Sequence, residues 1–162
     1  MGTWTNNDGL KVRFGADGVE DTLKGGSNGY VGAEREYSLE FDYTDLEAIN
    51  TATIIDIFNI PDNFQVTSVT LQNLTPFDSA SDAGTLDIGV IQTDRTTAVD
   101  LDGLGDGITQ TQLNANNFDT TTGTAVLVGT TLTNGGYLTL TERSAAFTAG
   151  EGRIIIRGFT AA

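Results

Sequence analysis

The sequence of 162 residues contains neither cysteine nor histidine. Without cysteine there is no disulfide framework, so nothing marks the chain as an oxidised secreted domain. The two absences also remove thiolate nucleophiles, structural zinc sites, the usual base of a catalytic triad and any charge switch near neutral pH. We therefore expect none of these kinds of site, and we predict no catalytic residue, no cofactor site and no metal site, apart from the calcium site left open below.

Basic residues are scarce as well, because 8 lysines and arginines stand against 22 acidic residues, for a formal net charge of −14. The range 44–94 holds no basic residue and eight acidic ones. Such a charge repels nucleic acids and anionic membranes, since affinity for phosphate comes mainly from lysine and arginine. No apolar run is long enough to span a bilayer, and the first residues lack the apolar core of a signal peptide. We expect a soluble protein that binds neither nucleic acid nor membrane.

The length suits a single compact domain. A domain of this size typically buries roughly 70% of the surface that its unfolded chain exposes, so a core can form without a disulfide or a metal. Hydrophobic residues make up 38% of the chain, and β-branched and aromatic side chains are plentiful among them. This composition is typical of a folded body and not of a disordered chain.

The first part of the chain, residues 1–32, differs from the rest because it contains eight glycines. Among these glycines lies one short segment in which apolar and basic residues alternate, as they do in a strand. We predict an extended glycine-rich arm that carries one short strand. Trp4, the sole tryptophan, either folds back on its own domain or anchors in a neighbouring subunit. The candidate contact residues of this arm are Trp4, Leu10, Val12 and Phe14.

The remaining residues, 33–162, are predicted to form one all-β domain. The range 35–43 alternates cleanly between apolar and polar side chains, as a half-buried antiparallel strand does. About eight such strands, separated by turn residues, indicate an antiparallel β-sandwich, with a jelly-roll-like arrangement as the variant. The sequence does not decide whether a short helix forms within 96–104 or 108–113. The firmest core predictions are Tyr37, Leu39, Phe41, Leu86, Ile88, Val90, Ile154 and Ile156.

Three local patterns predict particular strand features. The range 53–60 is apolar on both faces and therefore predicts a central strand, in which Asp56 must turn to an edge or find a partner. The apolar residues change phase between Val66 and Val69, which predicts a β-bulge or a change of sheet. The range 124–128 predicts a further short strand.

Asn134 and Gly135 predict a turn with positive φ, because asparagine and glycine tolerate that conformation. The segment 92–123 is longer than loops usually run, so we expect it to be functional or mobile. Its acidic stretch Asp100–Gly107 is similar to a calcium loop, but Leu104 and Thr111 stand where an EF-hand needs acidic residues. We favour an acidic turn there and leave open a calcium site of another kind.

Three further groups of residues could carry function. An aromatic row could bind a sugar, although a row in a sheet that needs a core more often packs inside: Tyr37, Phe41 and Tyr43. A basic cluster either offsets acidic strand faces internally, which we favour, or docks on an acidic partner: Arg143, Arg153 and Arg157. Two carboxylates alone could run a glycosidase, but no acidic pair stands out. We therefore expect no enzyme.

Four segments of strands and turns, followed by the closing isoleucine-rich strand, have a familiar order: 4–15, 60–71, 88–95 with 100–104, and 127–150. Through these segments, over most of its length, the chain resembles the small decoration or cement proteins of tailed bacteriophages, which are encoded close to the major capsid protein. It implies a β-sandwich, made in the host cytoplasm, that coats the exterior of the virion in many copies. The implied partners are the major capsid protein and other copies of the chain, as a trimer or dimer.

The arm suits this role, because strand addition to an exposed sheet edge needs only backbone groups and a few side-chain pockets. An oligomer that bridges several capsid subunits also turns weak single contacts into durable binding. Three alternatives remain. The chain could belong to the neck, tail or head fibre of a virion, it could be a carbohydrate-binding module, or it could be a hydrolase built on a carboxylate pair.

Overall fold

The structure is a computed structural model, and it describes residues 2–5, 11–14, 34–120 and 125–160. The chain divides into two compact units, residues 1–30 and 31–162. In the first unit, strands β1 (Gly2–Thr5) and β2 (Lys11–Phe14) pair antiparallel. The sequence predicts one strand in this part, and β1 is additional to it. Trp4 is the single large apolar residue in this strand, so the sequence shows no alternation there.

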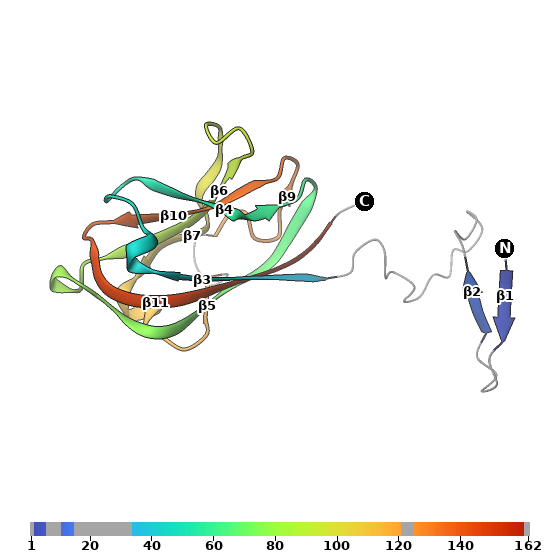
Figure 1. Ribbon diagram of the computed structural model, residues 1–162, viewed down its shortest axis with the longest axis horizontal. Coiled ribbons are helices and arrows are strands. Elements are labelled where there is room, and N and C mark those ends of the chain that lie inside the picture. The colour runs from blue at the N-terminus through green and yellow to red at the C-terminus, as the bar shows by residue number, and fades with distance from the viewer. Residues whose placement is uncertain (1, 6–10, 15–33, 121–124, 161–162) are drawn as a thin grey trace. The chain divides into compact units, whose positions relative to one another are not determined.

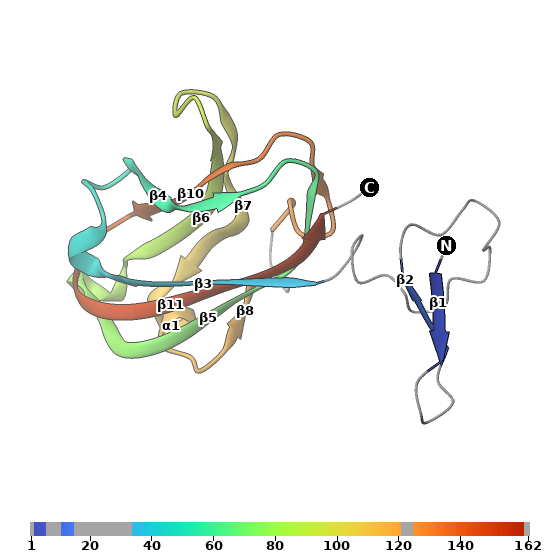
Figure 2. The same ribbon diagram turned by 45° about the vertical axis from the view of Figure 1, so that its right-hand side comes forward.

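The second unit is an all-β sandwich of two antiparallel sheets, as the sequence predicts (Figure 1). One sheet has the order β4-β10-β6-β7, and the other has the order β3-β11-β5-β8, with β9 also paired to β5. The strands are β3 (Arg35–Asp42), β4 (Ala52–Ile60), β5 (Phe64–Ser79), β6 (Thr85–Gln92), β7 (Ala98–Thr109), β8 (Phe118–Asp119), β9 (Thr131–Leu132), β10 (Gly136–Arg143) and β11 (Phe147–Thr160). The single-turn helix α1 (Gln110–Leu113) lies beside β5 (Figure 2).

The core lies between the two sheets, where alternate residues of each strand meet. Burial confirms the predicted core residues of β3, β6 and β11, because their side chains are almost fully enclosed: Leu39, Phe41, Leu86, Ile88, Val90, Ile154 and Ile156. Tyr37 is half-buried and packs its ring against Phe58 and Phe64, with ring centroids 5.7 and 5.6 Å away. Strict alternation is therefore a sound guide to the inward faces of this sandwich.

The predicted central strand, β4, is in fact an edge strand. Among the described strands it pairs with β10 alone, and its register shifts so that Leu138 stands opposite Ile55 while Tyr137 stands opposite Asn59. Three residues of β4 therefore bulge out of the ladder, and Ile57 among them is 87% exposed. Asp56 pairs with Arg95 at 2.7 Å. The bulge explains why apolar residues occur on both sides of an edge strand.

The change of phase in β5 marks a β-bulge, as predicted. Arg157 of β11 stands opposite Ser68, and Gly158 stands opposite Val66, so Thr67 is the additional residue. The additional residue shifts the alternation of side chains along the strand by one position. As a result, side chains on both sides of it face the core, namely Phe64, Val66, Val69 and Leu71.

Two predictions between β8 and β10 are wrong. The range 124–128 is not a strand, because residues 126–129 form a turn, and Thr124 lies outside the described residues. Neither Asn134 nor Gly135 has a positive φ, because the segment carries the chain from β9 in one sheet to β10 in the other and does not close a hairpin. A Cβ at Gly135 would lie 2.1 Å from the carbonyl oxygen of Ile60, so close packing explains this glycine.

The segment 92–123 is not one long loop. It contains β7, α1 and β8, and α1 lies within the second of the two ranges in which a short helix was left open. The range 96–104 contributes to β7 instead. Within the described part of the chain, no helix is long and apolar enough to cross a membrane.

Candidate functional site

The pairing of β7 with β6 is interrupted by two irregular segments in which β7 has more residues than β6. We call these segments departures, and both contain acidic residues. Between Asp100 and Gly105, β7 has four residues where β6 has Gly89 alone. Between Gly105 and Ile108, it has two residues where β6 has Asp87 alone. Additional residues of this kind lift a strand out of the regular ladder and redirect its side chains.

Two glycines make these departures feasible. A Cβ at Gly89 would lie 2.1 Å from the carbonyl carbon of Leu101 and 2.4 Å from the carbonyl oxygen of Asp100. The backbone of the first departure therefore lies directly on Gly89. Gly107, in the second departure, has a φ of +60°, in the left-handed region that side chains disfavour.

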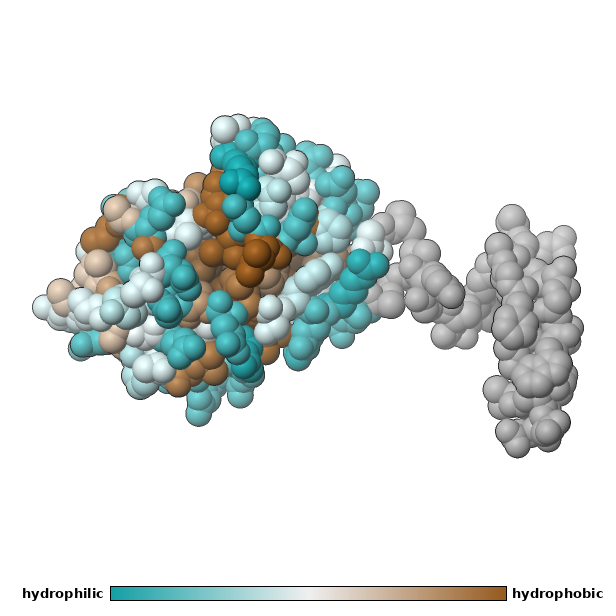
Figure 3. All heavy atoms as spheres, in the orientation of Figure 1, coloured by the Kyte–Doolittle hydropathy of each residue, from teal (hydrophilic) through white to brown (hydrophobic). Residues whose placement is uncertain are grey.

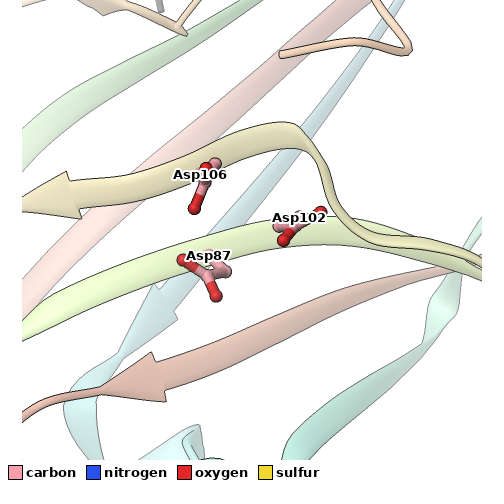
Figure 4. A group of neighbouring side chains, drawn as sticks. All are labelled: Asp87, Asp102 and Asp106. Carbon is pink, nitrogen blue, oxygen red and sulfur yellow. The ribbon is translucent and has the colours of Figure 1, made fainter. Parts of the chain in front are cut away.

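The departures bring three carboxylates together on the outer face of the four-stranded sheet. Asp87 comes from β6, whereas Asp102 and Asp106 come from β7, and one oxygen of each lies within 4.8 Å of the others. Figure 4 shows the three side chains converging on a common space. Asp87 is buried, Asp102 is half-buried and Asp106 is exposed, so the cluster runs from the sheet to solvent.

Asp87 is held rigidly at the base of this cluster. Its side chain is 5% exposed, and its Oδ2 accepts a hydrogen bond from Nε of Arg143 at 2.7 Å. The backbone N–H of Gly107 donates to its Oδ1 at 2.8 Å. Arg143 also donates to the side-chain oxygen of Asn50 at 3.2 Å. The buried carboxylate thus has an ion pair and a second donor, as a buried charge requires.

Asp102 is crowded by a neighbouring acid. A hydrogen bond with the Asp100 side chain, burial and the charge of Asp100 all raise the pKa of Asp102, while the charge of Arg143 acts in the opposite direction. The backbone N–H of Asp102 also donates to Oδ1 of Asp100 at 3.3 Å. A fourth carboxylate therefore lies next to the three that converge.

The floor beside the cluster is formed by two threonines of β10. Thr141 stands directly opposite Asp87, and Thr139 stands opposite Gly89. Both are almost completely buried, and neither hydroxyl has a hydrogen-bond partner among the described residues. Buried hydroxyl groups are usually paired, so these two call for an explanation.

The arrangement suits the binding of a cation better than acid–base catalysis. A glycosidase needs two carboxyl groups that both reach the substrate, whereas Asp87 is buried and already accepts two hydrogen bonds. The structure nevertheless brings together three carboxylates that the sequence does not single out as a group. Asp100–Gly107 is recognisable from the sequence, but the contribution of Asp87 depends on the pairing of β6 with β7 and has no local signal.

The other predicted sites take up roles within the fold. Arg153 binds Glu40, and Arg157 binds Glu36 at 2.8 Å, so these arginines offset acidic residues of β3 and confirm the internal interpretation. The aromatic row does not form an exposed platform, because Phe41 is buried. Its ring packs against that of Phe77, with the centroids 5.7 Å apart.

In the arm, the backbones of Trp4 and Val12 stand opposite one another in the β1–β2 pair, and Phe14 stands opposite Gly2. Leu10 lies outside the described residues. The role of the four arm residues as contacts stays a prediction.

The surface of the second unit combines acidic charge with exposed apolar side chains. Between residues 34 and 160 there are 5 basic and 18 acidic residues, for a net charge of −13. Four of these five arginines are in salt bridges within the described residues. Figure 3 shows apolar surface near the middle of one face of this unit. Ile57 of β4 is among the exposed apolar residues of the unit.

Comparison with models of known protein families finds no match, and comparison with curated proteins finds none either. Among solved structures, the chain is similar to a chain of the cyanophage Pam1 capsid asymmetric unit, with a TM-score of 0.58 and 18% sequence identity. The likeness covers 91% of this chain and 93% of that chain, so the two have similar lengths. At this identity the comparison shows a shared fold: the sandwich is one that a chain of a phage capsid also adopts.

Proposed function

We propose that the protein is a structural component of a phage virion, a decoration protein on the outer surface of the capsid that binds the lattice of the major capsid protein and stabilises the head. The observation that carries the proposal is the likeness to a chain of a phage capsid over nearly the full length of both chains. A chain of a capsid asymmetric unit is repeated by the symmetry of the shell, as a lattice-coating protein must be. In this proposal the chain has no enzymatic activity.

The charge of the second unit supports a position on the exterior. A net charge of −13 over residues 34–160 gives each copy a repulsive field, which keeps coated particles apart in solution. Four of the arginines in this range are already in internal salt bridges. The capsid surface that receives the protein should therefore be basic, and electrostatic attraction of this kind weakens as salt is added.

The arm supplies the proposed contact with the lattice. It is a unit of its own and contains two short strands, so it can engage a neighbour without rearranging the sandwich. Trp4, Leu10, Val12 and Phe14 are the proposed contacts, by strand addition to an exposed sheet edge. A trimer or dimer of the chain would hold several arms at once and gain avidity.

The test is the copy number of the protein in purified particles, measured by quantitative mass spectrometry against the major capsid protein. We expect hundreds of copies, and we expect purified protein to rebind to heads from which it has been stripped. A dozen copies or fewer would contradict decoration and move the protein to the neck or tail. Complete absence from particles would refute the virion role altogether.

A second experiment tests the arm alone. A chain lacking residues 1–15 should keep the far-UV circular dichroism of the sandwich and lose its rebinding to stripped heads. Full-length Ile57→Ser is the matched control, because it removes an exposed apolar side chain from the second unit and leaves the arm intact. Normal rebinding of the truncated chain would refute the role of the arm and leave the copy-number test unaffected.

A further inference from the structure

The three converging carboxylates are close enough for one cation to bind them together. Oxygens of Asp87, Asp102 and Asp106 lie within 4.8 Å of one another. Calcium takes six to eight oxygen ligands in a flexible geometry and commonly binds several carboxylates. Magnesium demands near-octahedral geometry and is usually held by one or two carboxylates and water. A group of three carboxylates therefore favours calcium.

Thr141 is an independent observation that points to a ligand at the same place. Its side chain is 2% exposed, and its Oγ1 has no hydrogen-bond partner among the described residues. Because Thr141 stands directly opposite Asp87, the two side chains leave the sheet on the same face, with Cβ atoms roughly 5 Å apart. A cation held by the carboxylates would give this buried hydroxyl oxygen the partner that it lacks.

The charge of the cluster also fits a divalent ion. The three carboxylates and the guanidinium of Arg143 sum to a net charge of −2, and the neighbouring Asp100 adds further negative charge. Each oxygen of Asp87 accepts one hydrogen bond and keeps a second lone pair free for a metal. Arg143 and the N–H of Gly107 thereby orient the Asp87 carboxylate, as outer partners of metal ligands commonly do.

We propose that these residues form a calcium site, with Asp87, Asp102 and Asp106 as carboxylate ligands and the Thr141 hydroxyl as a ligand from the floor. Water would complete the coordination on the exposed side, where Asp106 lies. The ion ties both departures of β7 to β6 and so stabilises the four-stranded sheet. The site is independent of the proposed role on the capsid and does not rest on it.

The direct test is calorimetric titration of CaCl₂ into the EDTA-treated full chain. We expect one site with a Kd between about 10⁻⁵ and 10⁻³ M, the range of weaker natural calcium sites. At a hundred times Kd, the melting temperature should rise by about 5 to 10 °C over that in EDTA. MgCl₂ at equal concentration should produce a smaller rise. Absence of both heat and thermal shift would overturn the proposal, and an equal effect of magnesium would overturn the assignment to calcium.

Two variants separate binding at this site from general screening of acidic charge. Asp102→Asn should weaken calcium binding at least tenfold, because it removes one charged ligand. Asp78→Asn, which removes an equal charge from an exposed position on β5, is the matched control and should bind as the wild type does. Loss of binding in the control as large as that in Asp102→Asn would show screening alone and refute the site.

Thr141→Val tests the fourth ligand. The substitution keeps the shape of the side chain and removes an unpaired buried hydroxyl, so in EDTA the variant should be at least as stable as the wild type. Its calcium affinity should nevertheless fall several-fold. Unchanged affinity would remove Thr141 from the site, and lower stability in EDTA would show that its hydroxyl serves the fold instead.

Discussion

Replacement of Gly89 by alanine should destabilise the protein through contact with backbone atoms. The new Cβ would lie 2.1 Å from the carbonyl carbon of Leu101, whereas ordinary contacts of a Cβ begin at 3.4 Å. The backbone of β7 must therefore retreat by about 1.3 Å, or β6 must yield by as much. Overpacking of this kind typically costs about 1–3 kcal/mol. We expect Gly89→Ala to reach the upper end, about 3 kcal/mol, because no flexible side chain can move aside.

Gly105→Ala is the matched control on the neighbouring strand. Its Cβ would meet Cδ1 of Ile108 at 2.7 Å, and the end of that side chain can rotate away. We expect a loss of about 1 kcal/mol. For a chain of this length, each kcal/mol lowers the melting temperature by roughly 2–4 °C.

The assay is urea unfolding followed by far-UV circular dichroism, which reports on the strands. If Gly89→Ala loses no more stability than Gly105→Ala, then the β7 backbone does not lie on Gly89, and the account of the two departures fails. A change in the slope of the unfolding free energy against urea concentration would show instead that the unfolded state has changed.

Three further predictions concern the core, the buried ion pair and pH. Ile154→Ala should cost about 3–4 kcal/mol in urea unfolding, because the side chain is fully buried, while Ile57→Ala at an 87% exposed position should cost less than about 0.5 kcal/mol. Arg143→Leu should cost about 2 kcal/mol, because it leaves the buried Asp87 carboxylate without its ion pair, and an unchanged midpoint would contradict that. Burial raises the pKa of Glu142, so the folded state favours the protonated side chain. The resulting stability is present below the ordinary pKa of glutamate and is lost as pH rises through the raised value. Glu142→Gln keeps an acceptor for the Phe147 N–H and should therefore be more stable than the wild type at pH 7 but not at pH 4, as urea midpoints at the two pH values would show.

Local patterns predicted the parts of the fold that depend on neighbouring residues. Alternation identifies Leu39 and Phe41 as inward-facing because successive side chains of a strand point to opposite faces. The bulge at Thr67 was also visible, since an additional residue changes the phase of the apolar residues on either side of it. Both signals lie within a few residues of the feature that they predict.

Features that depend on strand order could not be predicted in this way. Apolar residues on both faces of β4 fit a central strand as well as a bulged edge strand, and only the pairing with β10 distinguishes them. The convergence of Asp87 with Asp102 depends on which strand lies beside β6. Asn134 and Gly135 have the composition of a hairpin turn, but the chain changes sheets at that point.

The order of the strands has a consequence for synthesis on the ribosome. β10 lies between β4 and β6, and β11 lies between β3 and β5, so the centre of each sheet is made after both of its neighbours. Glu40 of β3 has no Arg153 to pair with until the ribosome has added 113 more residues. At ordinary rates of translation this takes roughly 6 to 23 seconds. During that interval β3 and β5 have no central strand to join them. The glutamates of β3, later paired with arginines of β11, then act as unpaired charges that keep a nascent strand from joining its counterpart on a neighbouring ribosome.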